Sequence, residues 1–83
     1  MKCTFIQGKA FYIDRLDENG TYEIYDYGTL VLIVDVFKKE LTRKWDSSSN
    51  TTSRHINMFL QELGLKKIVY SDLPVDQPVS YAN

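Results

Sequence analysis

The sequence is short of the residues that build disulfides and metal sites. Its 83 residues include one cysteine, Cys3, and one histidine, His55. A lone cysteine cannot form an intrachain disulfide, and with a single histidine it cannot supply the four ligands of a structural zinc site. The sequence therefore indicates a fold held by its own core in a reducing compartment, with no metal or other cofactor.

The chain also lacks a long hydrophobic run. Its longest apolar stretch, residues 30–34, is far shorter than the roughly 20 residues that span a membrane. Residues 1–14 lack the apolar segment of about 7 to 15 residues that a signal peptide requires. We therefore expect a soluble, cytoplasmic protein with no membrane partner.

What the chain does contain is enough apolar material for one small domain. Apolar residues make up 43% of the sequence and aromatic residues 13%, which suffices for a hydrophobic core without disulfide bonds or a bound metal ion. The net charge is −1, but residues 1–37 carry three Lys or Arg against six Asp or Glu, and residues 38–70 carry seven against three. A basic second half is compatible with an anionic partner, although scattered cations more often form ordinary solvated surface.

The first half has the pattern of an antiparallel sheet. Asn19 and Gly20 predict a hairpin turn, because both residues tolerate a positive φ. Residues 29–37 are nearly all apolar and β-branched, which predicts a central strand buried on both faces. Lys38 and Lys39 predict a further tight turn. The expected strands are residues 9–16, 21–27, 29–37 and 40–45.

The second half contains one expected helix, residues 52–63. A core-facing stripe recurs at positions i, i+3, i+4 and i+7, namely Ile56, Phe59, Leu60 and Leu63. The Thr-Thr-Ser run at residues 51–53 is expected to cap its start. Gly64 is expected to end it in a Schellman motif that folds Leu65 back onto the helix.

The chain is expected to finish with a short strand and a tail. Residues 66–70 read as the last strand. Pro74 and Pro78 indicate that residues 74–83 form an extended, mobile tail. The predicted fold class is therefore α+β, a small antiparallel sheet of four to five strands with one amphipathic helix packed on one face, forming a single domain over residues 1–73.

The start of the helix gathers several candidate functional groups. Its free backbone N–H groups, with Arg54 and His55, could hold a phosphate or carboxylate. On a helical wheel, however, Arg54 points away from the core and His55 lies at the edge of the apolar stripe, as a hydrogen-bonded packing residue would. No nucleophile elbow or oxyanion motif accompanies the histidine, so we do not expect an enzyme.

A second candidate surface mixes cations and aromatic rings. Arg43 and Trp45 fall on one face of an expected strand, and the preceding strand carries Tyr22, Tyr25 and Tyr27. Such a face could stack nucleic-acid bases. Against this, alternating tyrosines are ordinary in strands, and no ribonucleoprotein-type motif is present.

Two motifs carry a family resemblance. Residues 25–31 read Tyr-Asp-Tyr-Gly-Thr-Leu-Val, and Trp45-Asp46 precedes Ser-Asn-Thr-Thr-Ser-Arg-His-Ile at residues 49–56. Over residues 25–63 the chain resembles a family of short uncharacterised proteins, a domain of unknown function, encoded by phages and mobile elements of gut and related bacteria. That family has a tyrosine where this chain has serines between the two parts of the second motif. The resemblance implies a small accessory protein that binds a host or phage macromolecule.

We therefore predict a non-enzymatic binding module that contacts a protein partner through an exposed sheet edge or a tyrosine-rich surface. The candidate contact residues are Tyr25, Tyr27, Arg43, Trp45, Arg54 and His55. The alternative is a nucleic-acid-binding module that uses the basic second half. Its candidate residues are Arg43, Lys44, Arg54, Lys66 and Lys67.

Overall fold

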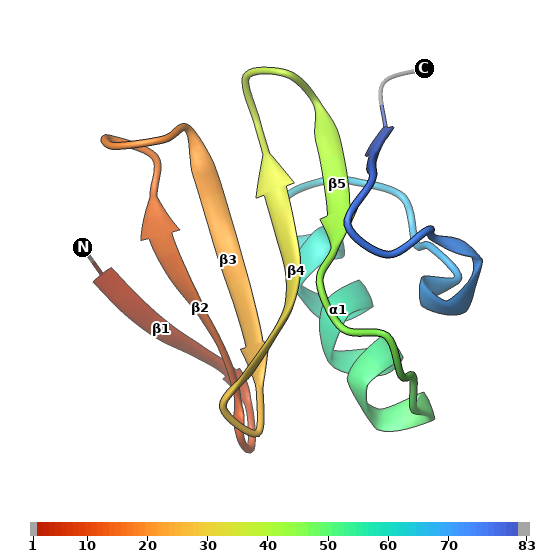
Figure 1. The fold of residues 1–83 in the computed structure, drawn as a ribbon. Helices are drawn as coiled ribbons and strands as arrows, with labels where there is room; N and C mark the ends of the chain where they lie inside the picture. The colour runs from red at the N-terminus through yellow and green to blue at the C-terminus, as the bar shows by residue number, and fades with distance from the viewer. Residues whose placement is uncertain (1, 82–83) are drawn as a thin grey trace.

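The computed structural model describes residues 2–81 and shows a six-stranded antiparallel sheet with one α-helix behind it (Figure 1). The strands follow chain order across the sheet, so each pairs with the next. They are β1 (Lys2–Gln7), β2 (Ala10–Arg15), β3 (Thr21–Asp26), β4 (Thr29–Asp35), β5 (Glu40–Arg43) and β6 (Pro78–Ser80). Helix α1 (Asn50–Glu62) and a 3-10 turn, η1 (Tyr70–Asp72), lie between β5 and β6 in the sequence. The α+β class is confirmed.

The expected number of strands, four to five, is wrong because the sheet has a strand at each edge that was not among the expected strands. β1 pairs with β2, with Phe5 opposite Phe11. β6 pairs with β5, with Val79 opposite Leu41. Residues 78–80 are therefore part of the sheet rather than a tail, and the final tail residues 82–83 lie outside the described residues.

The strand expected at residues 66–70 does not form. The side chain of Asn57 on α1 takes the place of a neighbouring strand, because its Oδ1 accepts the N–H of Ile68 at 2.8 Å and its Nδ2 donates to the Ile68 carbonyl at 3.0 Å. Both backbone groups of Ile68 are thereby satisfied by one side chain. The segment instead leads directly into η1, whose Tyr70 is 1% exposed.

The core lies between α1 and one face of the sheet. Ile56, Phe59 and Leu60 of the helix are fully buried, which confirms most of the predicted stripe. The Phe59 ring packs against Tyr12 and Tyr22, with centroids 4.4 and 5.2 Å away. Tyr22 therefore belongs to the core face. Within the described residues, no helix has the length and apolar character needed to cross a membrane.

The helix boundaries follow from its two caps. α1 begins before the expected Thr52, because Ser49 is the N-cap and its Oγ accepts the Thr52 N–H at 3.1 Å. The expectation that residues 51–53 cap the helix is therefore wrong. At the other end Gly64 has φ 78°, and the N–H of Leu65 donates to the Leu60 carbonyl at 2.9 Å. This confirms the predicted Schellman motif.

Ser49→Ala is expected to lower the free energy of unfolding by about 1 kcal/mol, because the helix loses the acceptor for one free N–H. Urea denaturation followed by circular dichroism measures the change. Ser48→Ala is the matched control, since that exposed serine has no part in the cap, and it should shift stability by less than about 0.5 kcal/mol. Equal effects of the two substitutions would contradict the assignment of the cap.

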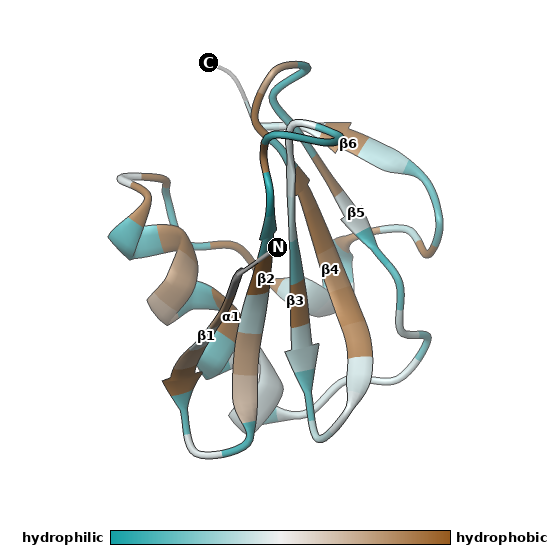
Figure 2. Cartoon of the chain, turned by 90° about the vertical axis from the view of Figure 1, so that its left-hand side faces the viewer, coloured by the Kyte–Doolittle hydropathy of each residue, from teal (hydrophilic) through white to brown (hydrophobic). Residues whose placement is uncertain are grey.

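The sheet is covered on one face only. Leu32 and Val34 of β4 are fully buried under the helix, whereas Leu30 and Ile33 are only half-buried. The prediction that this strand is buried on both faces is therefore wrong, because the described chain contributes one helical layer and no second one. In Figure 2, β4 is hydrophobic along much of its length, and α1 lies on one side of the sheet. We call the side away from α1 the open face.

Candidate functional site

The open face carries a row of aromatic rings. Phe5 of β1, Phe11 of β2 and Tyr25 of β3 stand opposite one another in the register of the sheet. The rings of Phe11 and Tyr25 stack at 5.1 Å between centroids and 8° between planes, and Phe5 meets Phe11 edge-on at 6.0 Å. Such pairs gain about 0.5–1.5 kcal/mol beyond their buried area. We call these three residues the aromatic row.

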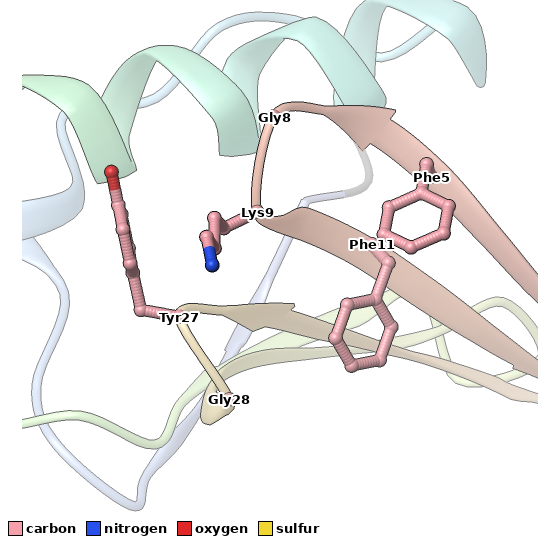
Figure 3. Close-up of a pocket in the computed structure, with 6 residues that line it drawn as sticks. All are labelled: Phe5, Gly8, Lys9, Phe11, Tyr27 and Gly28. Atoms are coloured by element: carbon pink, nitrogen blue, oxygen red, sulfur yellow. The ribbon is translucent and has the colours of Figure 1, made fainter.

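A hollow of about 720 Å³ lies beside the aromatic row (Figure 3). Figure 3 shows the rings of Phe5 and Phe11 on one side of it, the ring of Tyr27 on the other, and the side chain of Lys9 between them. The residues that line the hollow are Phe5, Gly8, Lys9, Phe11, Tyr27 and Gly28. It is therefore built from two strands and from the two turns at the same end of the sheet.

The rim of the hollow exposes two large rings to water. Phe5 is 70% exposed and Tyr27 is 68% exposed. Contiguous exposed apolar surface on a small protein marks an interaction site more often than a single exposed ring does. These two rings, with Phe11 between β1 and β3, make such a surface.

The backbone at Tyr27 is strained in a way that presents its ring. Tyr27 has φ 53° and Gly28 has φ 78°, so the β3–β4 hairpin turns through two left-handed residues, an arrangement that favours Asn-Gly. A non-glycine residue in this region costs of order 1 kcal/mol, and such strain is found at functional sites more often than elsewhere. The turn holds the Tyr27 ring at the rim of the hollow.

Lys9 gives the hollow a positive charge. Among the described residues, the ion pairs that form do not include Lys9. The other cation near the row, Arg15, is bound by Glu23 at 2.9 Å. Tyr25 donates to the same carboxylate at 3.1 Å, and burial, with a contribution from Glu23, raises the pKa of Tyr25. The Lys9 ammonium is thus the free charge of the site.

A buried polar cluster lies where β3 meets the start of α1. Asp26 Oδ2 accepts the Thr52 hydroxyl at 2.9 Å and lies 3.1 Å from His55 Nδ1. Ser49 Oγ lies 3.0 Å from Thr52 Oγ1. Asp26 is 4% exposed and His55 is 5% exposed. The cluster fixes the helix start to the residue that precedes Tyr27.

The order of groups in this cluster differs from that of a catalytic triad. In a triad the histidine lies between the acid and the hydroxyl, whereas here Thr52 and His55 both bind the same oxygen of Asp26. Among the described residues, Asp26 Oδ1 has no hydrogen-bond partner. Within residues 2–81, no three His, Cys, Asp or Glu side chains gather as a metal site requires. The arrangement serves to anchor the helix.

Arg43, a candidate in both predicted sets, is a buried structural residue that is 8% exposed. Its guanidinium donates to four backbone carbonyls, those of Trp45 at 2.8 Å, Ser47 at 3.0 Å, Leu73 at 2.9 Å and Ser71 at 3.3 Å. It also lies 4.7 Å from the centroid of the Tyr70 ring. Every nitrogen of the group is engaged, so the expectation of a surface cation here is wrong.

The other predicted contact residues do not form one surface. Tyr25 and Tyr27 lie at the open face, whereas His55 is buried and Trp45 packs against the core. The predicted face that combined Arg43 and Trp45 with three tyrosines is therefore absent from the described chain. Arg54 is exposed on the outer side of α1, as the helical wheel indicated.

The cations of the alternative set are also separated. Lys44 is paired with Asp76 at 2.6 Å. Lys66 and Lys67 are exposed, and Lys67 and Arg54 border a smaller hollow of about 220 Å³ on the helix side of the molecule. The basic second half thus supplies one small cationic area, remote from the aromatic row.

Sequence reasoning missed Phe5, Lys9 and Phe11. Residues 2–7 and 10–15 flank Gly8-Lys9, a short glycine-containing connection typical of hairpins. That signal predicts β1, and the pairing of β1 with β2 then brings Phe5 next to Phe11. The aromatic row could therefore have been predicted from the sequence.

Comparison with known proteins gives a family but no described activity. No curated protein and no solved structure matches the chain. One family model, described as a family of unknown function, matches residues 2–74. This range includes β1 to β5 and α1, and thus every residue that lines the hollow. The chain belongs to this family of unknown function, DUF8033.

Proposed function

We propose that the chain is a non-enzymatic binding module that holds a protein partner on its open face, at the aromatic row and the hollow. The observation that carries this proposal is the exposure of Phe5 and Tyr27 around one shared hollow. Aromatic rings are enriched at protein interfaces because they bury large area at little cost in side-chain entropy. In the free protein these rings remain in water, so covering them favours association.

The charge of the open face favours a protein over a nucleic acid. Single-strand binders combine stacking rings with a cationic groove that follows the phosphate backbone. Here Lys9 is unpaired, while Arg15 is neutralised by Glu23. The Arg15–Glu23 pair, whose carboxylate also accepts the Tyr25 hydroxyl, therefore adds no net positive charge beside the row to attract phosphates. An apolar face with one cation suits a protein surface with one acidic group.

The proposal includes the biological setting that the motif resemblance implies. We propose an accessory protein of a phage or mobile element that acts in the cytoplasm of its host. The resemblance of residues 25–31 and 45–56 supports the first part. The exposed free thiol of Cys3 supports the second, because such a thiol persists in a reducing compartment.

The test is a double variant that removes both exposed rings without disturbing the fold. Phe5→Ser with Tyr27→Asn is expected to reduce capture of a protein partner from host lysate at least tenfold, since asparagine tolerates the left-handed backbone at residue 27. Capture is quantified by mass spectrometry after nuclease treatment. Val69→Ser is the matched control, because Val69 is 61% exposed but lies outside the hollow. Undiminished capture by the double variant would overturn the proposal.

The alternative, nucleic-acid binding, is favoured by the shared position of Arg54 and Lys67 at the smaller hollow. Fluorescence anisotropy with labelled single- and double-stranded oligonucleotides at low and moderate salt tests it. Binding that weakens steeply with salt, as phosphate contacts require, and that is lost in Arg54→Ala with Lys67→Ala would support this alternative. Absence of binding at low salt would exclude it.

A further inference from the structure

One edge of the sheet is open to another strand. β1 is the first strand in the order of the sheet and pairs only with β2 among the described strands, and Figure 1 shows it at the outer edge. An edge strand presents unpaired N–H and C=O groups along its free side. The opposite edge, β6, is three residues long and begins with Pro78, which cannot donate to a ladder. β1 is the longer edge, with six residues, and its ladder is regular over residues 2–5, before an irregularity between Phe5 and Gln7, so residues 2–5 are the part suited to accept a partner strand.

The open edge and the hollow are continuous. Phe5 belongs to β1 and also lines the hollow. A strand added to β1 would lie about 4.8 Å away from it, and alternate side chains of that strand would stand on the open face beside the Phe5 ring. Gly8 continues this edge to the hollow, and a Cβ placed on Gly8 would meet nothing within 4 Å. Space is therefore free for a partner chain to pass over the turn.

The charge of this edge selects the partner. Residues 1–13 contain Lys2 and Lys9 and no acidic residue. In the register of the sheet Lys2 stands opposite Asp14 of β2, whereas the ion pairs of the described residues do not include Lys9. The unmatched charge of this edge is therefore the Lys9 ammonium, which an acidic segment would complement.

We infer that the partner supplies an extended acidic peptide segment, which adds to β1 as a seventh strand and places a large apolar side chain in the hollow, with a neighbouring carboxylate on Lys9. This inference rests on the proposed function and names the chemistry of its partner. Main-chain hydrogen bonds to the edge provide affinity in such strand addition, and pockets for alternate side chains provide specificity. The edge of β1 and the hollow correspond to these two parts.

The test begins with selection of a phage-displayed library of random dodecapeptides on the immobilised full chain. The expected result is enrichment of peptides that carry Phe, Trp or Leu within two positions of Asp or Glu. Lys9→Glu is expected to weaken the best peptide at least tenfold in fluorescence polarisation, whereas Lys38→Glu, a charge reversal in the exposed β4–β5 turn, should leave binding unchanged. Enrichment without acidic residues, or equal effects of the two variants, would overturn the inference.

Strand addition is tested on the selected peptide itself. Two versions are N-methylated at alternate positions, one at odd and one at even residues. Antiparallel pairing uses only one alternating set of N–H groups, so one version should lose binding at least tenfold and the other should keep it. Equal affinity of the two versions would show that the peptide does not pair with β1 as a strand.

Failure of this inference is distinguishable from failure of the proposed function. If no peptide is enriched while Phe5→Ser with Tyr27→Asn still abolishes partner capture, the open face binds a folded surface and only the peptide inference is wrong. If oligothymidylate binds instead, in a manner that requires both Phe5 and Lys9, the occupant is a nucleic acid and both the inference and the proposed function are wrong.

Discussion

Replacing Arg43 with alanine is expected to lower the free energy of unfolding by about 4 kcal/mol, the larger of the effects we predict. The guanidinium donates to the carbonyls of Trp45, Ser47, Ser71 and Leu73. A hydrogen bond to a charged group contributes about 1.5–3 kcal/mol, and the contributions of several bonds to one group are not additive. Carbonyls that are left unpaired in a buried site add a desolvation penalty. A small domain has only about 5–15 kcal/mol in total.

The four carbonyls explain why the effect should spread beyond one strand. Two belong to the segment that leads from β5 to α1, and two belong to the segment around η1. Neither segment has a strand partner of its own at these positions, so Arg43 serves as their shared donor. Loss of this group should therefore expose Tyr70, whose ring lies against the guanidinium and whose hydroxyl donates to the Val31 carbonyl at 2.7 Å.

Urea denaturation followed by the fluorescence of Trp45 measures the change. Arg43→Lys separates charge from geometry, because lysine keeps the charge but lacks the planar fork, and it should lose most of the same stability. Arg54→Ala is the matched control on the surface and should change stability by less than about 0.5 kcal/mol. If Arg43→Ala behaved like Arg54→Ala, the carbonyl contacts would not be stabilising and Arg43 would return to the candidate binding residues.

The parts of the fold that sequence predicts well are those fixed by neighbours in the chain. The stripe of Ile56, Phe59 and Leu60 defines the buried side of α1, because helical periodicity alone places these residues together. Gly64 ends the helix for a local reason, its left-handed backbone. The hairpin between β2 and β3 is equally local, although only Gly20 of the predicted Asn19-Gly20 pair has a positive φ, 72°. Each of these features depends on contacts within a few residues, which a sequence pattern records directly.

The last edge strand, β6, depends on distant contacts instead. β6 forms by pairing with β5, with Val79 opposite Leu41 and Ser80 opposite Glu40. The residues near position 79 carry no local sequence pattern that predicts this pairing. Residues 66–70 have strand composition, yet Asn57 satisfies the backbone at Ile68. Composition indicates what a segment is able to form, while the available partner decides what it does form.

The candidate site shows the same division. Tyr25 and Tyr27 were accessible to sequence reasoning because strand composition and a Gly-containing turn are local signals. The burial of Arg43 could not be predicted from the sequence, because two of its acceptors are the carbonyls of residues 71 and 73. A single arginine in a strand pattern is equally consistent with a surface cation. The partner of His55 is Asp26, on a strand far earlier in the chain, so its anchoring role required the folded structure.

Asp26→Ala is expected to lower the free energy of unfolding by about 3 kcal/mol. Asp26 is 4% exposed, and it accepts from the Thr52 hydroxyl and from His55 Nδ1. Removing the carboxylate leaves two buried donors without an acceptor, at a cost of about 1–3 kcal/mol for each. In the native protein, Asp26 Oδ1 is buried without a partner among the described residues, which costs desolvation energy. Because the Asp26→Ala variant no longer has this cost, part of the lost stability is recovered. We therefore place the net effect below that of Arg43→Ala.

A double-mutant cycle between Asp26→Ala and His55→Ala isolates the link between β3 and the helix start. Because the two side chains share a buried hydrogen bond, their effects should be non-additive by about 1 kcal/mol or more. Asp17→Ala, in an exposed turn, is the matched control and should combine additively with His55→Ala. Additivity of Asp26 with His55 would mean that the imidazole does not depend on this carboxylate. The start of α1 would then be tied to β3 through the hydrogen bond from the Thr52 hydroxyl to Asp26, without a contribution from His55.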